Sequence, residues 1–334
     1  MNADNLVDLA SRAMGGSVVY ANDESFADRE NLINPGPARF NPRDFGAKGQ
    51  VYDGWETRRR RESGSDHAIV RLGAPGLVHT VLVDTAHFTG NYPPQAAVDG
   101  CCVDGYPSPA ELATAQWFPL VDRSDLTGDA VHTFPVGEPN RQARVTHLRL
   151  TIFPDGGVAR LRAHGVPLFD PDLLPAVFDL AAAEYGGRVV DCSDRFYGSP
   201  GNLLLPGLAV NMGDGWETRR RRDDGNDWVL VELAGAGGVH LLELDTTHFK
   251  GNAPGWAEVT DGNGRTLLPR TRLQPDTRHR FRVTDPGPVD RLRLDIHPDG
   301  GMARLRAYGS LTAPARDAVA HRWQRATTLA RDLR

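Results

Sequence analysis

The sequence predicts an all-β protein built as two tandem β-sandwich repeats, each with a short leading helix, followed by a C-terminal helix. Three observations predict this class. The nine-residue string Asp53–Arg61 returns letter for letter as Asp214–Arg222, which indicates a tandem duplication. Short β-type runs recur about every 8–12 residues in both halves, as in a sandwich or jelly roll. The 36 glycines and 24 prolines favour the many turns that such short strands need.

Length and composition favour two domains of ordinary size. The chain has 334 residues, 40% of them hydrophobic, which is enough for each half to bury its own core. We expect a first repeat at 1–167, a second at 168–312 and a helical tail at 313–334. The net charge of −5 argues against a general nucleic-acid binder.

Location is predicted from what the sequence lacks. No apolar run approaches the roughly 20 residues that cross a bilayer, and the N-terminus does not resemble a signal peptide. The three cysteines are too few and too scattered for a disulfide framework or a zinc site. We therefore expect a cytoplasmic protein that needs no membrane partner.

The two halves repeat the same order of elements. Each begins with apolar residues at helical spacing, ended by Gly-Gly, and continues with a short strand. Two further runs in each half resemble a hairpin, and two alternating runs around a Pro-Asp-Gly-Gly turn resemble another. An extra stretch of about 17 residues in the first half, between Asn91 and His147, is expected to be an irregular loop that covers a site or meets a partner. The ranges are 4–14 and 170–185 for the leading helices, 17–20 and 188–190 for the next strands, 68–72 with 79–83 and 228–233 with 240–244 for the first hairpins, 148–152 with 159–163 and 292–296 with 303–307 for the last hairpins, and 314–333 for the final helix.

The duplicated string predicts a strand rich in guanidinium groups. Side chains alternate along a strand, so Glu56, Arg58 and Arg60 share one face, and Trp55 lies on the other. A carboxylate flanked by two arginines is a paired set, and arginine suits planar recognition of carboxylates and urea-like groups. The alternative is a solvated basic edge strand whose charges discourage aggregation.

A second shared motif runs from Asp84 to Asn91 and returns from Asp245 to Asn252. It places Asp, His and Asn at the end of a strand, where functional groups concentrate. The alternative for its histidines is a structural role in which the ring bonds a backbone group. One His and one Asp at a bend do not make a metal site, so no metal and no cofactor are predicted. The Pro-Asp-Gly-Gly turn is explained by conformation alone.

These motifs resemble the allantoicase family. Gly-Trp-Glu-Thr-Arg-Arg-Arg-Arg occurs twice, and each copy is followed by Asp-Thr-x-His-Phe-x-Gly-Asn; the resemblance runs from about Gly15 to Gly309. It implies jelly-roll repeats of the galactose-binding-like type, hydrolysis of allantoate to ureidoglycolate and urea in purine breakdown, and a homo-oligomer. The second copy departs from the first, with Trp228 in place of His67 and His297 in place of Phe153. The two copies are therefore chemically unequal.

The residues suggest roles for that reaction. Arginines would bind the substrate carboxylate and ureido oxygens, glutamates would orient them, and histidines held by aspartates would act as acid and base. The catalytic candidates are His87, His248, Asp84, Asp245, Glu56 and Glu217, and the substrate-binding candidates are Arg58, Arg60, Arg219, Arg221, Trp55, Trp216, Asn91 and Asn252. Two other functions stay open: a non-catalytic ligand- or carbohydrate-binding tandem module, and a metal-dependent hydrolase of another ureide.

Overall fold

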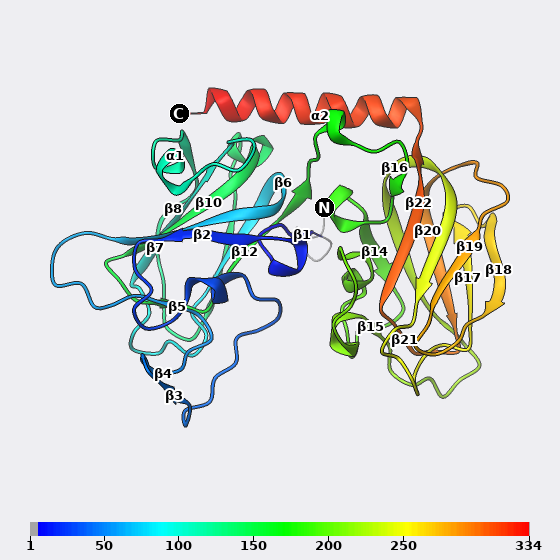
Figure 1. The fold of residues 1–334 in the computed structure, drawn as a ribbon, viewed down its shortest axis with the longest axis horizontal. Helices are drawn as coiled ribbons and strands as arrows, with labels where there is room; N and C mark the ends of the chain where they lie inside the picture. Colours follow the sequence, from blue (N-terminus) through cyan, green and yellow to red (C-terminus); the bar gives the residue numbers. More distant parts are fainter. Residues whose placement is uncertain (1–5, 334) are drawn as a thin grey trace. The chain divides into compact units, whose positions relative to one another are not determined.

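The computed structural model describes residues 6–333, and their contacts divide it into two compact units (Figure 1). One unit holds residues 6–168 with 322–333, and the other holds residues 169–321. Each is built around one eight-stranded sheet, and the two sheets repeat the same strand order. The prediction of two tandem all-β repeats is confirmed.

The first repeat carries its main sheet in the order β1-β12-β6-β10-β7-β8, with β2 and β9 also paired to β6. Two small strand pairs, β5 with β11 and β3 with β4, lie outside it. The strands are β1 (Val7–Asp8), β2 (Ser17–Ala21), β3 (Phe45–Gly46), β4 (Gly49–Gln50), β5 (Trp55–Glu56), β6 (Asp66–Asp84), β7 (Gln95–Cys101), β8 (Trp117–Asp125), β9 (Val131–Pro135), β10 (Arg144–Phe153), β11 (Gly157–Val158) and β12 (Arg160–Pro167).

The second repeat has the corresponding order β13-β22-β16-β20-β17-β18, with β14 and β19 paired to β16. Its small pair joins β15 to β21. The strands are β13 (Phe178–Asp179), β14 (Arg188–Cys192), β15 (Trp216–Glu217), β16 (Asp227–Asp245), β17 (Trp256–Asp261), β18 (Thr266–Arg272), β19 (Arg278–Arg282), β20 (Pro288–His297), β21 (Gly301–Met302) and β22 (Arg304–Leu311).

One long strand replaces the first predicted hairpin in each repeat. β6 is continuous over 19 residues, and its pairing register with β10 shifts across the segment Gly73-Ala74-Pro75. Its first half pairs with β2 and β10, and its second half pairs with β9 and β12. The glycine-rich stretch is therefore a bend within one strand, and the hairpin prediction was wrong because each half finds different partners.

The second predicted hairpin was wrong as well, because β10 and β12 lie on opposite sides of β6. Ile152 pairs with Asp66, and Arg160 pairs with Asp84. The seven residues between Ile152 and Arg160 span at most about 27 Å, whereas a straight β6 would separate Asp66 from Asp84 by about 60 Å. β6 must fold back on itself, and this makes each unit a two-layered sandwich. The Pro-Asp-Gly-Gly segment is the crossover between the layers.

The leading helices are reduced to single 3₁₀ turns. Residues 4 and 5 lie outside the described part of the chain, and Val7–Asp8 forms β1 instead of helix. The turns η2 (Arg12–Met14) and η6 (Ala183–Tyr185) each end at a glycine with positive φ, as the Gly-Gly pairs predicted. Pairing of β1 and β13 with the sheet outweighs the helical spacing.

The extra stretch of the first repeat is more ordered than predicted. It contains β7, β8 and β9, which match β17, β18 and β19 of the second repeat. What the second repeat lacks is the connection 102–116, which carries helix α1 (Pro109–Ala113) with a Ser108–Glu111 capping box. The second repeat joins β17 to β18 through the tight turn 262–265.

The remaining connections are short 3₁₀ turns, and the chain ends in a long helix. These turns are η3 (Arg29–Ile33), η4 (Asn140–Gln142), η5 (Pro171–Leu173), η7 (Pro200–Leu204) and η8 (Met212–Asp214). The final helix, α2 (Ala313–Asp332), confirms the prediction for 314–333. From Arg322 onward it groups with the first repeat, where Ala326 packs with Leu77 and Leu168. No helix between residues 6 and 333 has the length and apolar character needed to cross a membrane.

Candidate active site

The arginines of the duplicated string pair with aspartates outside it. Nε of Arg58 lies 3.4 Å from Asp23, and Nη1 of Arg60 lies 2.6 Å from Asp66, which is buried. Arg219 and Arg221 repeat both pairs with Asp194 and Asp227 at 2.8 Å. The predicted set of Glu56 between two guanidiniums is therefore corrected. The chain leaves strand geometry after Glu56, so the alternation of faces does not continue.

Glu56 is bound instead by the last residue of the second motif. Nδ2 of Asn91 donates to its carboxylate at 2.6 Å, and Asn252 donates to Glu217 at the same distance. Burial raises the pKa of Glu56, against the opposing effect of the Asn91 hydrogen bond. The structure therefore brings Glu and Asn together in both repeats, from strings that are 35 residues apart.

The two tryptophans of the duplicated string are buried and bond the loops that carry Asp23 and Asp194. Trp55 and Trp216 have no exposed surface, and their indole N–H groups donate to the backbone oxygens of Asp23 and Asp194 at 2.7 and 2.9 Å. In this geometry the indoles fix the loops that carry the aspartates. They present no surface to a ligand.

In the second motif, aspartate and histidine do not bond each other. Asp84 accepts from the backbone N–H of Ala86, and the ring of His87 bonds the carbonyl oxygen of Ala38 through Nε2 at 3.3 Å. His248 bonds the carbonyl of Ala209 in the same way at 3.0 Å. The expected orientation of histidine by aspartate is corrected, because each ring instead anchors a neighbouring loop. Both histidines have positive φ, 70° and 73°, so their ring placement is fixed by the backbone as well.

Asp245 differs from its counterpart because it lines a polar cavity of about 420 Å³ within the second repeat. The cavity is rich in charged and phenolic groups. They are Asp179, Glu184, Tyr185, Glu243, Asp245, Arg278, Arg304, Arg306 and Tyr308, with Phe178, Ala182, Gly207, Leu208 and other small or apolar residues completing the wall. Such a concave site with convergent polar groups is the expected form of a small-molecule site.

Two buried arginines hold one wall of this cavity together. Arg304 donates to the backbone oxygens of Gly207, Asp214 and Ala303, and Arg306 donates to those of Leu205 and Gly207. Both side chains are at least nine-tenths buried. From the sequence alone, both residues are predicted only as members of a strand of alternating residues. The signal that identifies them is the repeated Ala-Arg-Leu-Arg string after each Pro-Asp-Gly-Gly turn.

Two buried polar atoms in the cavity wall have no hydrogen-bond partner. They are Nη1 of Arg306 and Oδ2 of Asp179, in residues that are 7% and 8% exposed, and 3.5 Å separates them. The two atoms form an ion pair with each other that is too long and poorly aligned to count as a hydrogen bond, so a polar ligand that bonded to both would give each a better partner. A ligand with both a carbonyl oxygen and N–H groups would satisfy both.

Two carboxyl groups of the cavity have raised pKa values. Burial raises the pKa of Glu184, with Arg306 opposing and Asp179 adding to the shift. Burial also raises the pKa of Asp179, against hydrogen bonds from the backbone N–H groups of Ala307 and Ala181 and the charge of Arg306. Perturbed carboxyl groups in a cleft are typical of acid–base sites.

Glu243 is bound by two arginines that differ in position. Arg278 and Arg280 each donate to it at 2.8 Å, but only Arg278 lines the cavity. Burial would raise the pKa of Glu243, but the hydrogen bonds and charges of both arginines outweigh it and lower the pKa. Arg278 thus presents a firmly charged guanidinium to the cavity, with its Nη1 uncommitted among the described contacts.

The first repeat has the frame of this cavity without its chemistry. Arg160 and Arg162 match Arg304 and Arg306, and Asp8 lies 3.3 Å from Arg162 as Asp179 lies near Arg306. By strand register, the remaining positions differ. Leu82, Val131 and His164 stand where Glu243, Arg278 and Tyr308 stand in the second repeat.

The fold and this site define a tandem β-sandwich with a cavity suited to a small ligand that carries carboxylate and amide-like groups. The family model described as the allantoicase repeat matches residues 7–168 and 178–312. The chain belongs to the allantoicase family. It is 56% identical over 314 residues to a protein of Nocardia farcinica named "Probable allantoicase", covering 92% of this chain and 94% of that one.

Another relative and a solved structure also belong to proteins named as allantoicases. A protein with the same name from Pseudomonas aeruginosa is 44% identical over 92% of this chain and 97% of its own. The crystal structure of allantoicase from Saccharomyces cerevisiae superposes with a TM-score of 0.82 at 33% identity, covering 91% of this chain and 92% of that one. Within residues 6–333, no three His, Cys, Asp or Glu side chains are grouped to hold a metal ion.

Proposed function

We infer that the chain is an enzyme that hydrolyses allantoate to ureidoglycolate and urea, and we place the reaction in the cavity of the second repeat. Membership of the allantoicase family supports the reaction. The observation that supports the place is the unsatisfied pair of Arg306 Nη1 and Asp179 Oδ2 beside the charged Arg278. Allantoate carries one carboxylate and two ureido groups on one carbon, and these match the groups of the wall.

Arg278 binds the substrate carboxylate in this proposal. Its side chain is 39% exposed and reaches the cavity while Glu243 holds its other edge. Arg306 Nη1 donates to a ureido oxygen, and Asp179 Oδ2 accepts from a ureido N–H. Both interactions replace the 3.5 Å ion pair between these two atoms, which make no hydrogen bond in the described structure, with hydrogen bonds to the substrate.

Proton transfer falls to the two carboxyl groups with raised pKa. The carbon–nitrogen bond to one ureido group breaks, water supplies the new hydroxyl, and urea leaves after gaining a proton. Glu184, which has no hydrogen bond or ion pair among the described contacts, donates that proton. Asp179, which accepts from two backbone N–H groups and lies 3.5 Å from Arg306, takes one from water. Each such group contributes about 10²–10⁴-fold to rate.

His248 acts as a positioning residue in the same proposal. Its ring fixes the carbonyl of Ala209, next to Gly207 and Leu208 in the cavity wall. His87, Asp84, Asn91 and Asn252 then have framework roles. Arg60 and Arg221, which are committed to buried aspartates, do as well.

Glu56 with Arg58, and Glu217 with Arg219, form the alternative place for the chemistry. The raised pKa of Glu56 favours it. The arginine side chains are 74% and 65% exposed, so they could reach a substrate. Glu56→Gln and Glu217→Gln, tested singly and together, decide whether this place contributes.

The matched pair Arg278 and Arg280 tests the proposed site. Urea release from allantoate is measured for Arg278→Gln and for Arg280→Gln. We expect kcat/KM to fall by about 30-fold or more in the first, as for a lost charged contact of at least 2 kcal/mol, and by less than threefold in the second. Equal losses would mean that the arginines act only by holding Glu243. A wild-type protein that releases no urea would overturn the reaction itself.

Two wider proposals concern the protein in the cell. We propose a cytoplasmic homo-oligomer; the free thiols of Cys101, Cys102 and Cys192 fit a reducing compartment. Light scattering at several concentrations tests the assembly. A binding module without activity and a metal-dependent hydrolase are the rival functions. Urea release that persists after prolonged chelation argues against both.

A further inference from the structure

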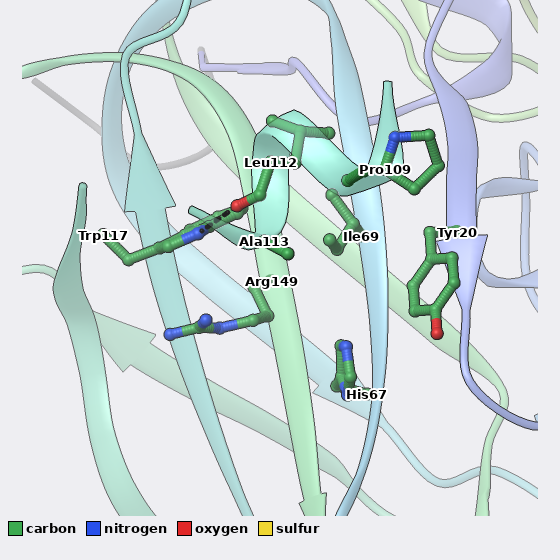
Figure 2. Close-up of a pocket in the computed structure, with 9 residues that line it drawn as sticks. Tyr20, His67, Ile69, Pro109, Leu112, Ala113, Trp117 and Arg149 are labelled. Atoms are coloured by element: carbon green, nitrogen blue, oxygen red, sulfur yellow. Dashed lines mark hydrogen bonds between the residues drawn. The ribbon is translucent and has the colours of Figure 1, made fainter. Parts of the chain in front are cut away.

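The first repeat has a cavity of its own beneath helix α1. Its volume is about 340 Å³, and it lies against the face formed by β2, β6, β8 and β10 (Figure 2). Pro109, Leu112 and Ala113 of α1 form one side, with Ile69 below them. The indole N–H of Trp117 donates to the carbonyl of Leu112 at 3.0 Å and fixes the helix to the sheet.

Polar groups gather on the other side of this cavity. His67, Tyr20 and Arg149 come from three different strands, and Figure 2 shows them around the same space. Within residues 6–333, the two ring nitrogens of His67 make no hydrogen bond, and the hydroxyl of Tyr20 makes none either. Arg149 uses Nε and Nη2 on Asp99 and leaves Nη1 free.

The groups around the cavity can donate hydrogen bonds to a carboxylate, while Asp99 balances the charge of Arg149 at 2.8 Å. Arg149 is held flat, with its guanidinium 4.7 Å from the ring centre of Trp117. Burial, followed by the charge of Arg149, lowers the pKa of His67, so the imidazole is neutral at pH 7 and offers one N–H. Tyr20 packs against that imidazole with 5.5 Å between ring centres.

The second repeat shows why the space is open only in the first. By strand register, Trp228 stands at the position of His67, and Asp191 stands at the position of Tyr20. Arg293, which matches Arg149, lies 4.4 Å from the ring centre of Trp228. The indole therefore occupies the place next to the arginine that the smaller imidazole leaves empty.

We propose that the cavity beneath α1 is a second ligand site, present in the first repeat alone, that binds a small planar carboxylate. The carboxylate lies against Arg149 Nη1, His67 and the hydroxyl of Tyr20. The flat part of the ligand lies along Pro109, Ala110 and Ala113 of α1, which line the cavity and are exposed. The volume matches a compact ring compound, since small-molecule pockets begin at about 300 Å³.

Arginine and the apolar wall explain the choice of ligand class. A guanidinium fixed in one plane suits a carboxylate, because two N–H groups can reach its two oxygens. The side chains of Pro109, Ala110 and Ala113 offer no hydrogen bonds, so a polar chain there would lose its own to water. A planar apolar ring loses none.

The test is equilibrium binding of benzoate, measured by calorimetry at pH 7 on the full chain. We expect saturable binding to one site, and binding at least tenfold weaker for acetate, which lacks the ring, and for cyclohexanecarboxylate, which is not planar. His67→Trp copies the second repeat and should weaken benzoate binding by at least tenfold. Tyr20→Phe, which removes one hydroxyl, should weaken it by about three- to tenfold.

The matched control is Trp228→Phe at the corresponding position of the second repeat, which should leave benzoate binding and urea release unchanged. Thermal melting shows that each variant is folded. Benzoate that fails to bind the wild-type chain, or that binds His67→Trp as well as wild type, overturns the proposal. Glu184→Gln should still bind benzoate, so this site and the proposed catalytic cavity can fail independently.

Discussion

The two repeats share a frame and differ in what that frame encloses. Both keep the buried tryptophan, the Glu–Asn pair, the arginine bonded to a buried aspartate and the histidine that anchors a loop carbonyl. Each cavity depends on residues that only one repeat has. His67 and α1 open a space in the first, and Glu184, Glu243 and Arg278 equip another in the second.

This difference shows that a position can be identical in the two halves for a structural reason and not because it binds a ligand. The identical string is held mainly by hydrogen bonds to its own repeat, so its identity reflects a common structural requirement. Some groups with free hydrogen-bonding capacity, such as His67, Tyr20 and Arg278, lie at positions where the halves differ, whereas Arg306 and Asp179 match Arg162 and Asp8. Positions where the repeats differ and positions where they agree therefore both contribute to the proposed ligand sites.

The largest expected effect comes from removing the proposed proton donor. Glu184→Gln keeps the shape of the side chain but not its titration, so kcat should fall by about 10²–10⁴-fold. Urea release from allantoate under saturating substrate measures it. Ala13 occupies the corresponding place in the first repeat, two residues before the positive-φ glycine that ends the turn. Ala13→Gln should leave kcat within twofold of wild type.

Two outcomes would break this part of the comparison. Full activity in Glu184→Gln would remove the second-repeat cavity from the chemistry. A large loss in Ala13→Gln, in a variant that melts like wild type, would place the reaction in the first repeat instead.

The sequence predicted the fold further than it predicted the site. Duplication, strand spacing and the final helix were sufficient for two all-β repeats. The hairpins were not predicted correctly, because local alternation cannot show that β10 and β12 pair on opposite sides of β6. Asp245 was identified because its motif is repeated. Glu184 and Arg278 were not, because they have no copy in the other half and meet only when η6 and β19 fold around one cavity.

A smaller effect, on stability, should be alike in both repeats. Arg60→Met leaves Asp66, which is 1% exposed, with only Asn22 as a hydrogen-bond donor. Breaking such a buried pair costs about 3 kcal/mol of unfolding free energy. Arg221→Met leaves Asp227 with only the hydroxyl of Ser193 and should cost the same within about 1 kcal/mol. Urea denaturation measures both, and a neutral result in one repeat would show that the shared frame is not equally needed.

The smallest effect is a pH dependence at His147, a position where the second repeat has an arginine. His147 is 1% exposed; it shares a hydrogen bond with Thr146 through Nδ1 and has no partner for Nε2. Thr146 donates its own hydroxyl to Cys101, so Nδ1 of His147 carries the proton and Nε2 is bare. Burial, and then the charge of Arg71, lower the pKa of His147 to about 4.

The sign of this effect follows from that lowered pKa. Below about pH 6.5 the unfolded chain binds a proton at His147 that the folded chain refuses, so stability falls as the pH drops toward 4. The loss is about 1.4 kcal/mol per pH unit, or about 2 kcal/mol at pH 5. His147→Gln should therefore lose about 2 kcal/mol less than wild type between pH 7 and pH 5 in urea denaturation. The second repeat has Arg291 at the corresponding position, so Arg291→Gln should follow wild type. Equal losses in wild type and His147→Gln would mean that the buried imidazole accepts its proton without unfolding.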